Sequence, residues 1–134
     1  MESPILSIQP VCTRIAFLLL AGGLGAVSRY ALSAGLNGCA WCGKPWGILI
    51  CNLLGCFLFG LLSVVLTRNF DAETKLIVLT GFLGAFTTFS TFVFDTVDLL
   101  DQSRYLTACA NVLLHNFLGI LMVLGGLLTG RLMT

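Results

Sequence analysis

The chain has 134 residues, of which 57% are hydrophobic and only 10% charged, and its formal net charge is +1. A soluble domain this small leaves much of its surface in water, and about 25% of its residues are typically charged. The composition therefore excludes an ordinary soluble domain, and the near-zero net charge argues against a nucleic-acid-binding protein. We expect a small integral membrane protein with one domain over residues 1–134.

Four long apolar stretches follow one another along the chain, over residues 15–36, 46–67, 76–98 and 105–130. Each is long enough for a membrane-spanning helix, which needs about 20 predominantly apolar residues. A cleaved signal peptide is the alternative for the first stretch, but it would not explain the motif that this stretch carries. The sequence predicts an all-α membrane protein with four transmembrane helices per subunit, joined by connectors too short to hold a soluble domain.

The positive charges are divided almost equally between the two sides of the membrane. Four spans place both termini on one side, together with Arg14, Arg68, Lys75 and Arg131, and leave Arg29, Lys44 and Arg104 for the other side. Because the Lys/Arg bias of short loops sets topology, this balance predicts insertion in both directions. Two oppositely inserted copies would form an antiparallel, dual-topology homodimer. The alternative is a weak bias with one dominant orientation.

The first connector contains a Cys39-Ala-Trp-Cys42 motif, whose spacing suits a redox pair or half of a zinc site. A membrane thiol oxidoreductase is therefore one rival function, but such an enzyme would need a second pair of loop cysteines. A small multidrug exporter is a second rival. Proton-coupled export of cations needs a carboxylate embedded in the first span, and the ionisable residue within this span is Arg29.

Polar residues inside the spans are the candidates for function, because they are costly in lipid without a partner or a water-filled cavity. Asn52 lies near the start of the second span and either links two helices or contacts a ligand. In the third span, Gly81, Gly84 and the Thr87-Thr88 step favour a break in mid-membrane. Unwound carbonyls at that depth would suit a small cation. The alternative is an intact helix whose hydroxyl groups bond to carbonyls one turn earlier.

Phe89 and Phe92 are three residues apart and therefore share one face of a helix. A single phenylalanine in a span most often packs against lipid or the protein core. Two ring edges together with the amide of Asn52 would instead make a weakly positive site without a strong cation. Such a site suits a small, hard anion that must be bound and released again.

The motifs together resemble the CrcB/Fluc family of fluoride channels. Residues 22–30 read G-G-L-G-A-V-S-R-Y, similar to the family's glycine-rich segment ending in Arg and an aromatic residue, and residues 52–55 read N-L-L-G. Residues 81–92 match the family signature G-F-x-G-x-x-T-T-F-S-T-F. The resemblance covers nearly the whole chain in order and spacing.

The resemblance implies a fluoride-selective ion channel rather than an enzyme. Family members are dual-topology homodimers with two antiparallel pores, and the third helix of each subunit is broken in mid-membrane. Cytoplasmic fluoride would leave passively, which would lower its toxicity. The resemblance implies a multi-pass protein of the plasma (inner) membrane, whose partners are the lipid bilayer, fluoride and an inverted copy of the chain.

The resemblance also gives roles to individual residues. A structural sodium ion (Na+) would lie at the dimer centre, held by the main-chain carbonyls of Gly84 and Thr87. Arg29 would be a structural or vestibule residue near an interface. The fluoride pathway would contain Asn52, Phe89, Phe92, Ser90, Thr91, Asp95 and His115.

Some positions depart from the family pattern. Asp95 stands where Glu is usual, and Ile48 stands where many members have Thr. Asn111 and His115 replace a Tyr and a Ser that are common one turn apart, and we interpret both as candidate polar lining. The alternative for His115 is a neutral imidazole that bonds across helices.

Overall fold

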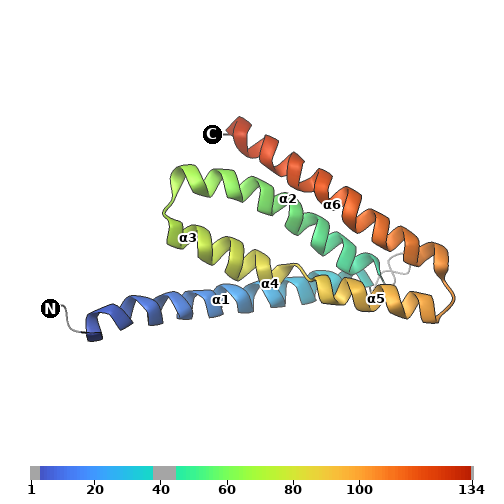
Figure 1. The fold of residues 1–134 in the computed structure, drawn as a ribbon, viewed down its shortest axis with the longest axis horizontal. Helices are drawn as coiled ribbons and strands as arrows, with labels where there is room; N and C mark the ends of the chain where they lie inside the picture. Colours follow the sequence, from blue (N-terminus) through green and yellow to red (C-terminus); the bar gives the residue numbers. More distant parts are fainter. Residues whose placement is uncertain (1–3, 38–44, 134) are drawn as a thin grey trace.

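The computed structural model describes the backbone of residues 4–37 and 45–133, and the side chains of residues 11–36 and 45–133. The described chain is helical apart from short connections (Figure 1). In chain order the elements are α1 (Pro4–Asn37), α2 (Trp46–Asn69), α3 (Ala72–Leu76), the π-helical η1 (Ile77–Leu83), α4 (Gly84–Phe86), α5 (Phe89–Asp101) and α6 (Tyr105–Met133). Cys39 and Cys42 lie outside the described residues, so the structure does not bear on the redox and zinc interpretations of that motif.

Four helical stretches are long and apolar enough to cross a membrane, namely Val11–Leu36, Trp46–Asn69, Ala72–Asp101 and Tyr105–Met133. The predicted all-helical, four-span architecture is therefore confirmed. The helices extend beyond the predicted stretches, most of all in α1, which begins at Pro4 rather than at residue 15. A helix satisfies its own backbone, so it can continue past the apolar segment that reveals it in the sequence.

Asp71 ends the connection before α3 as an N-cap. Its carboxylate accepts a hydrogen bond of 2.7 Å from the backbone N–H of Thr74, as expected for an aspartate that precedes a helix. Hydrogen bonds from the side chain and backbone of Thr74 lower the pKa of Asp71 below its ordinary value. Because the pKa is lowered on folding, the cap stabilises the protein at neutral pH, and this contribution disappears as the pH falls through the lowered pKa.

Helices α2 and α6 run side by side and form the most extensive helix pair (Figure 1). Gly126 and Gly130 of α6 are buried in this contact, as is Gly60 of α2. A Cβ atom added at Gly126 would collide with the carbonyl oxygen of Phe57. The small residues therefore allow the two backbones to approach each other, which is a common basis of helix packing in membranes.

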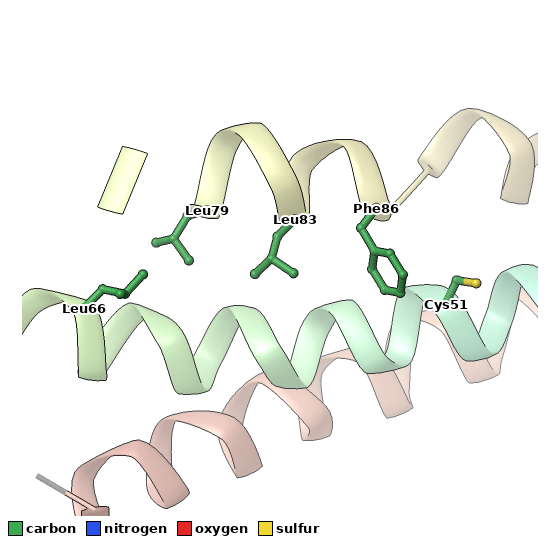
Figure 2. Packing of buried hydrophobic residues seen from close by; sticks show 5 residues of the cluster. All are labelled: Cys51, Leu66, Leu79, Leu83 and Phe86. Atoms are coloured by element: carbon green, nitrogen blue, oxygen red, sulfur yellow. The ribbon is translucent and has the colours of Figure 1, made fainter. Parts of the chain in front are cut away.

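The third span packs on α2 through a row of apolar side chains. Leu79, Leu83 and Phe86 point from η1 and α4 toward α2, where they join Cys51 and Leu66 in one buried cluster (Figure 2). On its other side η1 approaches α1, where a Cβ added at Gly25 would collide with the carbonyl oxygen of Phe82. The segment before residue 87 is thus held between two other spans.

Candidate functional site

The helical backbone of the third span stops for two residues between α4 and α5. Thr87 has φ −90° and ψ 152°, and Thr88 has φ −148° and ψ 115°, so both are extended. The backbone N–H of Thr87 still bonds to the carbonyl of Leu83 at 3.0 Å, and the Thr87 hydroxyl bonds to the same carbonyl at 3.0 Å. The backbone groups of Thr88, however, need partners outside the helix.

Asn52 of α2 supplies both of these partners. Its Oδ1 accepts a hydrogen bond from the backbone N–H of Thr88 at 2.9 Å, and its Nδ2 donates to the Thr88 carbonyl at 3.1 Å. The amide of Asn52 thus satisfies both backbone hydrogen-bonding groups of Thr88 at the interruption. An amide nitrogen carries two hydrogens, so Asn52 keeps a second N–H beyond this pair of bonds.

Side chains also satisfy the two helix ends that meet at the interruption. The Thr88 hydroxyl accepts from the backbone N–H of Thr91 at 3.4 Å and acts as the N-cap of α5. It also lies 3.1 Å from the Thr91 hydroxyl and 3.3 Å from the Ser90 hydroxyl. On the other side, Nε of Arg29 donates to the carbonyl of Ala85 at 3.2 Å. A cation at the carboxyl end of a helical segment is favoured by the helix dipole.

A cavity of about 300 Å³ opens beside the interruption. Its wall comes from α2, from the interruption with the start of α5, and from α6. It is lined by Asn52, Gly55, Cys56, Phe59, Thr87, Thr88, Phe89, Phe92, His115, Asn116 and Val123. The lining contains amides, hydroxyls and aromatic rings, and neither Lys nor Arg is among these residues.

Three rings follow one another along this cavity. The ring centroids of Phe89 and Phe92 are 5.5 Å apart at an interplanar angle of 52°, and those of Phe92 and His115 are 4.3 Å apart at 37°. Phe92 is 8% exposed whereas Phe89 is 76% exposed. Phe92 therefore belongs to the interior of this chain, and Phe89 lies at its surface.

Polar side chains on the far side of Phe92 connect α5 to α6. Nδ2 of Asn111 donates to the hydroxyl of Thr96 at 2.9 Å, and that hydroxyl donates to the Phe92 carbonyl at 2.8 Å. Asn111 and Asp95 are both buried, at 0% and 5% exposure. The hydrogen bond between Asn111 and Thr96 thus links α6 to α5.

The structure brings together part of the site that the sequence predicts. Asn52, Phe89, Phe92 and His115 line one cavity, whereas Ser90, Thr91 and Asp95 are not among its lining residues. Of the residues proposed by resemblance to hold sodium, Thr87 lines the cavity and Gly84 does not.

Sequence reasoning missed two polar residues of the lining, Thr88 and Asn116. Thr88 belongs to the recognised motif, but its pairing with Asn52 depends on how two spans meet. Asn116 could have been found by the argument used for Asn52, because it is also an amide within an apolar span.

Comparisons with known proteins agree with the resemblance. Residues 16–127 match the family described as "CrcB-like protein, Camphor Resistance (CrcB)". A "Fluoride-specific ion channel FluC" of Solidesulfovibrio magneticus is 42% identical over 124 residues, covering 89% of this chain and 97% of that protein. Proteins of the same name are 42% identical in Nitrosococcus oceani, covering 84% of this chain and 92% of the relative, and 43% identical in Magnetococcus marinus, covering 89% and 98%. With a family match over most of its length and relatives at this identity, the chain belongs to the CrcB family of multi-pass membrane proteins.

Proposed function

We propose that this protein is a fluoride-selective channel that lets cytoplasmic fluoride leave the cell passively. The observation that carries the proposal is the cavity lined by an amide and aromatic rings, within a chain whose relatives are named fluoride-specific ion channels. Such a protein is a channel and not an enzyme, since it supplies a path and changes no bond. Its location in the plasma (inner) membrane is part of the proposal.

Selectivity follows from the chemistry of the lining. The second N–H of Asn52 and the positive edges of Phe89 and Phe92 offer weak contacts to a small, strongly hydrated anion. A permanently charged side chain such as Arg among these contacts would bind the anion too strongly for it to leave again, because it cannot lose its charge. The hydroxyls of Ser90 and Thr91, which lie beside the Thr88 hydroxyl, and the carboxylate of Asp95, one turn beyond Phe92, are further parts of the proposed pathway.

The functional unit that we propose is an antiparallel, dual-topology homodimer with the interrupted third span in mid-membrane. The near balance of four cations against three supports insertion in both directions. The exposure of Phe89, at 76% in one protomer, supports a second copy that completes the pathway on that side.

A structural sodium ion at the dimer centre fits the backbone at the interruption. In a continuous helix the carbonyl of Gly84 would accept from the N–H of Thr88, but that N–H bonds to Asn52. The carbonyl of Thr87 likewise loses the N–H of Thr91, which bonds to the Thr88 hydroxyl. Both oxygens are hard ligands suited to a small cation, which would link the two interruptions when bound. Within the described residues no group of three His, Cys, Asp or Glu side chains could hold a metal instead.

Fluoride efflux from liposomes tests the proposed channel. Purified protein is reconstituted into vesicles loaded with fluoride or with chloride, and a charge-compensating ionophore starts the efflux. We expect an electrode to record fluoride release and no chloride release. We also expect Phe89→Ile to abolish release, because it removes an aromatic edge from the proposed pathway. The fold should remain intact, because the exposed ring packs little of the core. Vesicles with folded wild-type protein that retain fluoride as empty vesicles do would contradict the proposal.

A further inference from the structure

Within the part of the chain that the structure describes, one nitrogen of His115 has no hydrogen-bond partner. Its Nδ1 lies 3.0 Å from the backbone carbonyl of Asn111, one turn earlier in α6. A carbonyl oxygen can only accept, so Nδ1 must carry the hydrogen of a neutral imidazole. Nε2 is then a bare acceptor, and within the described residues this buried atom is unpartnered. Buried polar atoms nearly always have a hydrogen-bond partner, so the unpartnered Nε2 indicates that a ligand or a proton binds there.

The position of His115 relates this nitrogen to the anion pathway. The imidazole lines the same cavity as Asn52 and Phe89, and its ring lies 4.3 Å from that of Phe92. His115 lines this space, and the lone pair of its buried Nε2 in the neutral imidazole repels a nearby anion. An imidazolium presents an N–H group instead, which donates a charge-assisted hydrogen bond. The protonation state of His115 therefore decides whether the residue opposes or binds fluoride.

The neighbours of His115 can support a positive charge there. Burial of the imidazole disfavours a positive charge on it, and Asp95 of α5 opposes this effect, because an ionised carboxylate attracts an imidazolium. The ring of Phe92 lies within the distance, about 6 Å, at which an aromatic face attracts a cation. Cys56 of α2 is the other titratable side chain at this cavity, and the neighbouring polar residues of α6 are the amides Asn111 and Asn116.

We propose that His115 binds fluoride through Nε2–H in its imidazolium form, so that one proton from solvent and one fluoride occupy the cavity together. This inference rests on the proposed function, because it specifies how the same pathway is regulated. Thermodynamic reciprocity requires that the proton strengthens fluoride binding by the factor by which fluoride strengthens proton binding. Because the imidazolium can lose its proton again and so release the anion, efflux then accelerates in acid, the condition in which neutral hydrogen fluoride forms and crosses the bilayer.

The pH dependence of efflux is the first test. The protonated fraction of a single imidazole rises by up to about 10-fold for each unit by which the pH falls. We expect efflux by the wild-type protein to rise several-fold from pH 8 to pH 6 with the slope of a single proton. His115→Gln carries a neutral amide donor, so its efflux should stay constant with pH. Empty vesicles at each pH correct for diffusion of hydrogen fluoride.

Equal efflux of the wild-type protein at pH 8 and pH 6 overturns the role of His115 and leaves the channel standing. An undiminished pH slope in His115→Gln overturns it as well, since another group would then be titrating. Absence of efflux at every pH contradicts the channel itself.

The imidazole can also be observed directly, because His115 is the one histidine of the sequence. The protein is prepared without a histidine tag, labelled with ¹⁵N in the imidazole and studied by NMR near pH 7.5. We expect fluoride, but not chloride at the same concentration, to shift both ring nitrogens toward imidazolium values. This readout does not depend on conduction. Imidazole signals that remain those of the neutral Nδ1–H form in saturating fluoride would overturn the proposal.

Discussion

Asn52 illustrates how a single residue contributes both to the fold and to the cavity lining. A polar residue in an apolar span is recognisable from the sequence, because lipid offers it no hydrogen bonds. The sequence left open whether Asn52 links helices or contacts a ligand. In the structure it bonds to both backbone groups of Thr88 and also lines the cavity. Its partner could not be predicted, because that pairing depends on the distance between two spans that are separate in the sequence.

Replacement of Asn52 tests its structural role. In Asn52→Ala the N–H and the carbonyl of Thr88 lose their partners in an apolar environment, and each unsatisfied group costs about 1–3 kcal/mol. We expect a loss of stability of this order, measured by reversible unfolding in detergent mixtures, together with a loss of fluoride efflux. The matched control is Asn116→Ala, because Asn116 lines the same cavity but its amide donates to the Val112 carbonyl of its own helix.

The control should change stability by less than about 0.5 kcal/mol, as exposed substitutions usually do. Similar losses of stability in Asn52→Ala and Asn116→Ala would show that the hydrogen bonds from Asn52 to Thr88 contribute no more to stability than the amide of Asn116 does.

His115 marks the limit of prediction for a single side chain. The sequence places a histidine in an apolar span, and a hydrogen bond from the ring could be expected. Which nitrogen is bonded, and which is left bare, depends on the rotamer and on the ring of Phe92 against it. Those are consequences of packing, which the sequence alone does not specify.

The third span is where the sequence is most informative about an element. Its glycines and its Thr87-Thr88 step are poor helix formers, and both threonines have extended backbone in the structure. The π-helical turn Ile77–Leu83 was not predicted. Such turns are rare, and this one lies where η1 must fit closely against Gly25 of α1, which is a tertiary constraint.

The glycines of α6 test how closely two elements must approach. Gly125 and Gly126 are adjacent in the sequence, which does not reveal which of them packs against another helix. In the structure an added Cβ at Gly126 would meet the backbone of α2, whereas one at Gly125 would meet nothing within 4 Å. We expect Gly126→Ala to destabilise the protein by about 1–3 kcal/mol through overpacking. Gly125→Ala should be neutral or stabilising by up to about 1 kcal/mol, because Ala favours a helix more than Gly does.

Thermal unfolding in detergent, followed by circular dichroism, measures both glycine variants under one condition. A loss of stability in Gly125→Ala as large as that in Gly126→Ala would mean that helix propensity and flexibility, rather than the contact with α2, determine the outcome.

For the whole molecule, the membrane makes the architecture predictable. A span must satisfy all its backbone groups internally, so four apolar stretches separated by short connectors leave little choice but four helices. The succession of apolar stretches does not predict how these helices pack against one another. The extensive pairing of α2 with α6, and the position of the third span over α1 and α2, follow from which faces carry glycines and which carry large side chains.

The proposed dual topology concerns the whole chain, because it rests on a charge balance that can be changed. Lys44→Gln with Arg104→Gln leaves four cations on the side of the termini against one on the other side. Arg68→Gln with Arg131→Gln and Gln102→Lys gives two against four. Because topology follows the Lys/Arg bias, each variant should insert in one orientation, and the two orientations should be opposite.

Reporter domains at the C-terminus measure orientation, and fluoride efflux from cells measures assembly. The wild-type chain should place its reporter on both sides of the membrane. Each biased variant alone lacks an inverted partner and should release little fluoride, whereas co-expression of the two should restore efflux because antiparallel pairs can form again. Efflux from cells that contain only one orientation would show that the channel functions without an inverted copy, and the near balance of charge along this chain would then have no part in its assembly.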